Sequence, residues 1–482
     1  MKKWTSPSIL FYIVFFLINS NSLFCQSKIH VIESNKLEQI KINDTIFQKF
    51  CGDVMIEYSD LKIQCDTITI NKHNDDVRAW GNVSFFNDTL KCLSDSIKIN
   101  ERLNTIIFYK NSQLSTNNIS IFGDFIQYDF KQKIIKYWKK GIVENMYYNI
   151  SSEEFIYHLK KEESIFSQNI KLISDSLTMY TENMINKDSL VVFFGPTSIN
   201  YENILIECQK GNLRNSNDFE ILEGLTIISD STTIKANYLK KDKNISYFKD
   251  EISIKSDNNI SIFGDRLVQE NEISTVTQNS YVELLNNNDS TNIRGDTIII
   301  DDNKKYAEIN NNVKILGNEL YGKCKKLTFD SNYTKMKMIN EPALWFKDIQ
   351  LTGDEIEIYF LNNNIDSMFI AENPFIIAPE DTTSLYHQIK GKILEGSFIQ
   401  NQIKFFELKG NGMMKYFENN NESIGVNNVN AGKIKLLFNE NLLENILCNQ
   451  EIESNYYEIE KDESNSYNSN QMYLNGFKLR NK

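Results

Sequence analysis

The chain has little of what enzymes and nucleic-acid-binding proteins use. Its histidines, His30, His73, His158 and His387, are too scattered for metal-ligand spacing. It has no Gly-x-Ser-x-Gly elbow and no phosphate-cradling glycine loop. The net charge is −12, and we find no basic stripe in the sequence to offset repulsion by phosphates. We therefore expect no catalytic residue, no metal, no cofactor and no nucleic-acid partner.

Proline and glycine are also scarce, with 5 and 19 residues among 482, which excludes collagen-like and low-complexity chains. Beyond the N-terminus no segment approaches the 18 or so consecutive apolar residues of a membrane-spanning helix. The cysteines are too widely spread for a compact disulfide scaffold. We interpret them as small side chains at tight bends, with disulfides or metal binding as the alternatives. Apart from Cys25 they are Cys51, Cys65, Cys92, Cys208, Cys324 and Cys448.

The N-terminus has the pattern of an export signal. Lys2 and Lys3 precede the apolar run Ile9–Ile18, which is short for a bilayer span. We predict a signal peptide over residues 1–25, with processing near Cys25. A lipoprotein acylated at Cys25 is the less favoured alternative, because bulky Phe24 stands where a small residue is expected.

A repeat begins near residue 50. Cys65, Ser94, Gly123 and Ser152 are each 29 residues apart, and each is followed by an acid. The octapeptide Asn117–Asp124 recurs unchanged at Asn258–Asp265. A fixed period of this length indicates a stacked architecture, in which one supersecondary unit is copied along an axis.

The apolar residues change parity at each of these corners. Ile119 and Ile121 precede Gly123, whereas Ile126 and Tyr128 follow it, so one extra residue intervenes. Such a residue is typical of a β-bulge, and the acid after the corner can accept hydrogen bonds freed by the bend. The pattern predicts an all-β protein of two facing antiparallel sheets, built from repeated units of roughly 29 residues, with an apolar trough between the sheets.

A second element precedes the first three corners by 13 residues. It reads Gly52-Asp53-Val54, Gly81-Asn82-Val83 and Lys110-Asn111-Ser112, and we interpret each copy as a polar turn that opens a strand. Helical periodicity is nearly absent, and Glu33–Ile42 could form at most one short helix.

The repeat and the composition together suggest a division of the chain. Spacing becomes irregular around Gly211, Pro374 and Pro379 interrupt the pattern, and Glu451–Ser469 is acidic and rich in Asn and Ser, as in disordered segments. The expected parts are a signal peptide (1–25), an N-terminal linker (26–45), a first jellyroll part (46–215), a second jellyroll part (216–372), a C-terminal β continuation (373–450) and a polar tail (451–482).

The Gly-Asn-Val at Gly81 and the Leu-x-Cys/Gly…Asp-x-Ile bends resemble the organic-solvent-tolerance domain of the OstA/LptA family, over roughly Phe50–Tyr359. The resemblance implies an elongated open β-jellyroll, or β-taco, in the periplasm, with association to the outer membrane as an option. It implies a non-enzymatic protein that shields the acyl chains of lipopolysaccharide during outer-membrane assembly. The implied partners are lipopolysaccharide, other β-jellyroll transport proteins that stack edge to edge, and the outer-membrane translocon. Gly52–Tyr58 and Lys433–Phe438 are the candidate docking edges.

The candidate lipid-binding residues are the inward apolar side chains near the corners, and for any one of them ordinary core packing is the competing interpretation. One alternative function is a structural or adhesive β-solenoid at the cell surface. Another is an enzyme on a β-helix, such as a polysaccharide lyase, which would need a cluster of charged residues on one outer face. The candidate groove residues are Ile63, Ile68, Ile70, Ile97, Ile99, Ile121, Ile126, Tyr128, Ile150, Phe155, Leu172, Leu177, Ile262, Leu267, Ile293, Ile298, Ile300, Leu351, Ile356 and Ile358.

Overall fold

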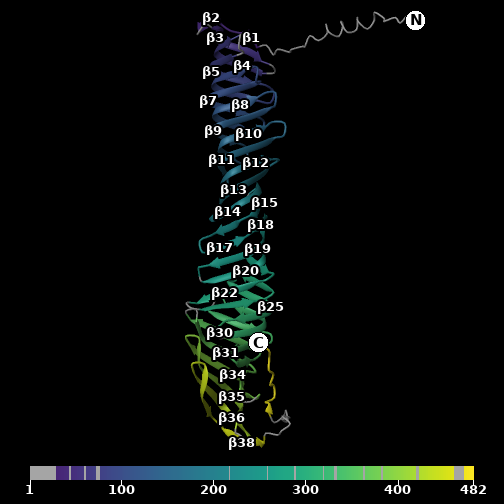
Figure 1. The fold of residues 1–482 in the computed structure, drawn as a ribbon, viewed down its shortest axis with the longest axis vertical. Helices are drawn as coiled ribbons and strands as arrows, with labels where there is room; N and C mark the ends of the chain where they lie inside the picture. Colours follow the sequence, from purple (N-terminus) through teal and green to yellow (C-terminus); the bar gives the residue numbers. More distant parts are fainter. Residues whose placement is uncertain are drawn as a thin grey trace, which may run out of the picture. The chain divides into compact units, whose positions relative to one another are not determined.

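The structure is a computed structural model (Figure 1). It describes residues 29–42, 45–58, 61–71, 76–215, 218–257, 259–286, 289–318, 320–330, 334–361, 364–380, 384–419, 423–460 and 472–482. The predicted signal peptide and Cys25 lie outside these residues. The chain divides into two compact units, unit 1 (residues 1–189) and unit 2 (residues 190–482), whereas the irregular spacing had placed a break near 215. Within the described residues, no helix has the length and apolarity needed to cross a bilayer.

Unit 1 is built from antiparallel strands. They are β1 (His30–Glu33), β2 (Lys36–Ile42), β3 (Thr45–Tyr58), β4 (Leu61–Asn71), β5 (Asp76–Phe86), β6 (Lys91–Asn100), β7 (Thr105–Ser115), β8 (Ser120–Asp129), β9 (Ile134–Glu144), β10 (Asn149–His158), β11 (Glu163–Ile173) and β12 (Leu177–Lys187).

Each strand from β3 to β11 pairs with the next, and each of these pairings is interrupted once near its middle. In β5 and β6, one stretch joins Asp76–Trp80 to Ser96–Asn100, and the other joins Val83–Phe86 to Lys91–Ser94. Each strand from β3 to β12 therefore contributes about half its length to each of two ladders. The two ladders meet at a crease. Ladder A contains the 76–80 stretch and its successors 105–109, 125–129, 134–138 and 154–158; ladder B contains 83–86 and its successors 112–115, 120–123, 141–144 and 149–152.

The crease is a row of bulges. Between the two stretches of β5 and β6, Gly81 and Asn82 stand opposite Asp95 alone. In β7 the equivalent residues Lys110 and Asn111 both have positive φ, at 59° and 44°. The interpretation of the second element as a turn that opens a strand is therefore wrong, because it lies in mid-strand and supplies the extra residue of each bulge. The apolar residues of β8 change parity at Gly123, as expected. The extra residue of the bulge, however, lies in the paired strand β7, where Lys110 and Asn111 stand opposite Asp124 alone.

Glycine suits the Gly81 position for two reasons. Its φ is +80°, and a Cβ there would lie 2.3 Å from Asp66 Oδ2. L side chains rarely adopt that backbone conformation, and Gly is the residue that reaches it without steric cost.

The N-terminal residues of unit 1 are strands and not the helix considered for Glu33–Ile42. β1 pairs with the ladder B half of β3, with His30 opposite Glu57, and β2 pairs with its ladder A half, with Lys36 opposite Cys51. Both strands fall inside the stretch expected to be a linker. Because Gly52–Tyr58 is covered by β1 on one side and β4 on the other, it is not an exposed edge.

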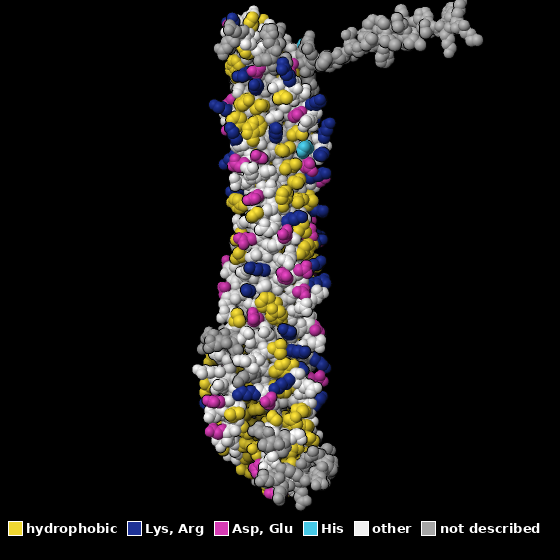
Figure 2. All heavy atoms as spheres, viewed as in Figure 1, with side chains coloured by type: hydrophobic (Ala, Val, Ile, Leu, Met, Phe, Trp, Pro, Cys, Tyr) yellow, Lys and Arg dark blue, Asp and Glu magenta, His cyan; other side chains and the backbone are white. Residues whose placement is uncertain are grey.

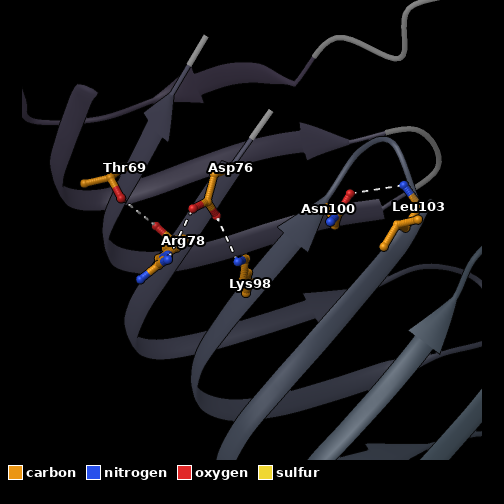
Figure 3. A network of polar contacts seen from close by, with 6 residues as sticks. All are labelled: Thr69, Asp76, Arg78, Lys98, Asn100 and Leu103. Carbon is orange, nitrogen blue, oxygen red and sulfur yellow. Dashed lines mark hydrogen bonds and ion pairs between the residues drawn. The ribbon is translucent and has the colours of Figure 1, made fainter. Parts of the chain in front are cut away.

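Polar contacts fix the outer surface of ladder A near the N-terminal end of unit 1 (Figure 3). Asp76 in β5 pairs with Arg78 at 3.2 Å and with Lys98 of β6 at 3.6 Å, while the hydroxyl of Thr69 in β4 donates to the Arg78 carbonyl at 3.5 Å. The Asn100 side chain accepts from the Leu103 amide at 3.1 Å and so closes the turn after β6.

Unit 2 is also built from antiparallel strands. They are β13 (Leu190–Tyr201), β14 (Ile204–Asn215), β15 (Asp218–Glu223), β16 (Leu225–Ile228), β17 (Thr232–Ala236), β18 (Tyr238–Asp242), β19 (Ile245–Ser256), β20 (Ile260–Glu270), β21 (Ile273–Thr277), β22 (Tyr281–Asn286), β23 (Asp289–Arg294), β24 (Thr297–Asp301), β25 (Tyr306–Leu316), β26 (Leu320–Phe329), β27 (Lys335–Ile339), β28 (Ala343–Phe346), β29 (Ile349–Thr352), β30 (Glu355–Leu361), β31 (Asn364–Ile370), β32 (Phe375–Pro379), β33 (Tyr386–Lys390), β34 (Ile393–Ile399), β35 (Gln402–Asn419), β36 (Ser423–Asn439), β37 (Leu442–Asn449) and β38 (Glu453–Glu460).

Unit 2 repeats the creased design, but several strands are cut in two at the crease. β19, for example, pairs through its first half with β18 and through its second half with β17. In unit 2, ladder A is the set that contains β18, β21, β24, β27, β30, β31, β34 and β37; ladder B contains β17, β22, β23, β28, β29, β32, β33 and β38. The predicted all-β architecture of facing antiparallel sheets is confirmed.

Candidate lipid-binding interior

The crease is held by carboxylate–amide pairs between neighbouring bulges. Asp66 accepts from the side-chain amide of Asn82 at 3.0 Å, and Asp95 accepts from that of Asn111 at 2.9 Å. Unit 2 repeats the arrangement, for example Asp296 with Asn312 at 2.8 Å. The expected role of the acid as a hydrogen-bond acceptor is thus observed. In these three pairs the donor is an asparagine side chain 16 residues later, which sequence reasoning missed.

The candidate groove residues line the space between the two ladders. All of them are buried except Ile70, Ile262 and Ile300, which are partly exposed. Alternation along each strand turns these side chains toward the opposite ladder and leaves their neighbours facing solvent. In β4, β6, β8, β10 and β12 a parity change at the crease keeps both halves of the strand apolar on the inner side, whereas the strands between them keep one parity throughout.

Aromatic side chains join the ladders across the interior of unit 1. Phe85 of ladder B stacks on Phe108 of ladder A, with ring centroids 5.4 Å apart and planes at 18°. At the open edges of the ladders, Tyr58 meets Phe130 at 5.2 Å. There too, the Asn118 amide donates to the Glu162 carboxylate at 3.4 Å, although these residues lie in turns of opposite ladders. We call the line along which these edges approach each other the mouth.

Unit 2 retains an apolar crevice between its ladders. The crevice has a volume of about 20 Å³, room for roughly one water molecule. Three candidate groove residues, Ile262, Ile298 and Ile300, meet in it. The candidate list lacked the others, although the same strand alternation would have found most of them: Ile260, Val282, Leu284, Ala307, Ile309 and Phe329.

Burial sets the chemistry of the polar atoms at the crease. It raises the pKa of the Cys65, Cys208 and Cys324 thiols to about 12, so they remain protonated at neutral pH. Burial likewise raises the pKa of Tyr137 to about 12; its hydroxyl lies 2.6 Å from Ser152 Oγ. In the described part of the chain, no group of three or more His, Cys, Asp or Glu side chains is placed to hold a metal ion.

The outer surface differs from the interior in composition. On the face shown in Figure 2, charged side chains of both signs are interspersed with hydrophobic ones. Unit 1 also exposes Trp80, Leu93 and Met146, each at 40% or more. The side chains buried between the ladders are, by contrast, mainly apolar.

The final segment, residues 472–482, which we call the tail, packs on the outer face of ladder B in unit 2. Two buried glutamines hold it through its backbone. Gln388 donates to the Met472 carbonyl at 2.8 Å and accepts from the Leu474 amide at 2.7 Å; Gln350 does the same with Lys478 and Arg480, at 2.9 and 2.8 Å. Met472 fills an apolar cluster with Leu385, Phe417, Ile424 and Val426.

The polar tail expected over 451–482 is therefore partly structured, since β38 (Glu453–Glu460) pairs with β36 and residues 472–482 are docked. Lys433–Phe438, the second candidate docking edge, is paired on both sides, with β35 and with β37. Among the described strands, β37 pairs with β36 alone and so presents a free edge.

The sequence profile of the OstA-like protein family matches residues 26–182. Over these residues the chain is similar to the OstA-like family. The resemblance predicted from the bends is thus confirmed there, and the OstA-like stretch contains β1 to β11 and the first half of β12.

No curated protein sequence matches this chain. One similar solved structure is that of LptH from Pseudomonas aeruginosa, described as the LptA-homologous periplasmic component of the conserved lipopolysaccharide transport device. It is 14% identical, the alignment covers 21% of this chain and 76% of that one, and the TM-score is 0.19.

Proposed function

We propose that this protein is a non-enzymatic carrier of lipopolysaccharide in the periplasm, during assembly of the outer membrane. The acyl chains would lie between the ladders against the groove residues named above, where apolar contact removes them from water. The observation that carries the proposal is the inward-facing apolar surface that the strands present on both sides of the crease. The similarity of residues 26–182 to the OstA-like family supports it.

Acyl chains need more room than the crevice of about 20 Å³ offers, so the proposal requires the ladders to part at the mouth. The contacts described there include the Tyr58–Phe130 ring contact and the Asn118–Glu162 hydrogen bond. An exposed hydrogen bond of this kind contributes roughly 0.5–1.5 kcal/mol, which burial of a single acyl chain of a dozen methylenes would exceed several-fold. On this proposal the crease acts as the hinge.

Photo-crosslinking from matched positions tests the proposal. A benzoylphenylalanine at Ile300, which lines the crevice, should capture lipopolysaccharide in cells, whereas the same probe at Ile299, on the outer side of the same strand, should not. Ile262 and its outward neighbour Phe263 provide a second pair. If neither inner probe captures lipopolysaccharide, although both crosslink to protein, lipid binding in the interior is refuted.

A locked variant tests the required opening. Cysteines at Asn118 and Glu162, joined by a short bifunctional maleimide, would hold the mouth of unit 1 closed; Cys51 and Cys448, the partly exposed thiols, are first changed to serine. Locking should abolish lipid capture by probes in unit 1. Unchanged capture by the locked protein would refute opening at the mouth.

The packed interior favours a second candidate function. Stacking of Phe85 on Phe108 and the burial of most groove residues also fit a structural or adhesive β-solenoid at the cell surface. That function predicts degradation of the protein by protease added to intact cells, and newly made lipopolysaccharide that still reaches the outer membrane when the protein is depleted. The carrier function predicts protection from protease and accumulation of lipopolysaccharide inside the cell.

A further inference from the structure

Three basic side chains lie directly opposite one another on the outer face of ladder B in unit 2. Arg294 of β23 pairs with Lys314 of β25, which in turn pairs with Lys323 of β26. Their chain neighbours Ile293 and Ile315 are fully buried, so the basic residues face outward. Like charges at directly opposite positions destabilise a sheet. Neighbouring strands elsewhere in this unit place opposite charges together instead, as with Lys335 and Glu357 at 2.8 Å.

The tail adds a fourth cation to this surface. The Arg480 amide is held by Gln350, and its Nη1 donates to the Glu341 carbonyl at 2.6 Å. Its Nε is buried and has no hydrogen-bond partner among the described residues. A buried N–H without a partner is costly, and an unoccupied edge of a guanidinium is suited to a bidentate oxyanion.

Lys314, Lys323 and Arg480 line a groove of about 370 Å³, and Arg294 lies beside Lys314 on the neighbouring strand. The charged residues of its lining are Lys314, Lys323, Lys325, Arg480 and Glu341, four cations against one carboxylate. Glu341 is well exposed and lies 3.3 Å from Lys325. The groove therefore carries a formal charge of +3 (4 − 1) on a chain whose total is −12. The four cations come from four separate positions on β25, β26 and the tail, which is why no basic stripe was visible in the sequence.

We propose that this basic groove binds a phosphate-type anion, either a free phosphate compound or the phosphate of a lipid headgroup. The lysine ammonium groups supply point charges, and the Nε edge of Arg480 supplies a directed fork for two phosphate oxygens. The site lies on the outer face of ladder B, so it does not depend on lipid uptake between the ladders.

Calorimetric titration of the purified full chain with inorganic pyrophosphate tests the site. Lys314→Gln, which leaves the tail contacts intact, should weaken binding about tenfold. Arg480→Lys, which keeps the charge but removes the fork, should weaken it several-fold. The control is the double variant Lys235→Gln/Lys255→Gln, which removes two exposed cations of unit 2 outside the groove and should stay within twofold of the wild type.

Absence of pyrophosphate binding by the wild type, or equal weakening by the control, would overturn the proposal. Hydrogen exchange of residues 472–482 in Arg480→Lys monitors docking of the tail; should the tail detach, Lys314→Gln alone decides the result. Sedimentation with vesicles of phosphatidylcholine containing 20% phosphatidic acid, against pure phosphatidylcholine, distinguishes the two sources. If the protein sediments with the phosphatidic acid vesicles and Lys314→Gln reduces this sedimentation, the ligand is a lipid headgroup. If the protein binds pyrophosphate but does not sediment with these vesicles, the ligand is a free phosphate compound.

Discussion

Replacing Phe85 and Phe86 separately with alanine gives the sharpest test of the creased architecture. The two residues are adjacent and chemically identical, but Phe85 is 1% exposed between the ladders and Phe86 is 40% exposed on the outer surface. Phe85→Ala removes the stacking partner of Phe108 and leaves a cavity, which typically costs about 3–5 kcal/mol. Phe86→Ala loses only part of a burial worth about 1.5–3 kcal/mol, so we expect a cost of about 1 kcal/mol.

Native-state hydrogen exchange of the full chain is the appropriate assay, because the opening of a repeat structure is local and a single unfolding midpoint averages over it. The free energy of opening for amides in β5, β6 and β7 should fall at least about 1.4 kcal/mol further in Phe85→Ala than in Phe86→Ala, a tenfold difference in opening equilibrium. Equal losses in the two variants, or a larger loss in Phe86→Ala, would refute the assignment of inner and outer faces.

Three other predictions concern the crease and the tail. Asp95→Ala breaks the carboxylate–amide pair of its bulge and should lower the local stability of β6 and β7 by about 0.5–1.5 kcal/mol, measured by hydrogen exchange. Gln388→Ala removes both hydrogen bonds to the start of the tail and should release it, so that the Leu474 amide exchanges at least tenfold faster. Because burial raises the pKa of Cys65, Cys208 and Cys324 to about 12 from an ordinary 9.0, their protonated thiols stabilise the folded chain below pH 9, and this contribution is lost as the pH rises from 9 toward 12. Alkylation by iodoacetamide at pH 8.5 should therefore be at least about a hundredfold slower at these thiols than in urea-unfolded chain.

Matched changes serve as controls. Asp88→Ala in an exposed turn should leave β6 unaltered, and Gln402→Ala, at an exposed position of β35, should leave the tail docked. A release of the tail by both glutamine variants would show that its docking does not depend on the Gln388 clamp. Rapid alkylation of the three buried thiols in folded protein would contradict their position inside the crease.

The repeat determined much of the fold because strand parity is a local property of sequence. The apolar positions around Gly123, for example, were enough to place Ile121 and Ile126 on the same inner side and to require a bulge between them. The strand that carries the extra residue depends on register, which is set between strands. Lys110 and Asn111 therefore resembled a turn, although their positive φ belongs to the middle of β7.

Other features could not be predicted from the sequence, because they depend on contacts between residues that are far apart in the chain. β1 and β2 are short and become strands by pairing with β3, so Glu33–Ile42 lacked a distinctive pattern. The tail docks through two glutamines more than 80 residues away from it. The groove residues face inward as expected, but their burial follows from the packing of one ladder against the other, as where Phe85 stacks on Phe108. No pattern within one strand reports that distance.

The asparagine–aspartate pairs have a consequence for how such a chain can change in length. The pairs span between 14 and 19 residues, inside a repeat of 29. A duplicated repeat would therefore carry both partners of its own pair. Two strands add roughly 10 Å, at about 4.8 Å for each strand. Gain or loss of whole repeats would thus adjust reach in steps while preserving the cross-section, and the identical octapeptides at Asn117 and Asn258 are what such copying would leave behind.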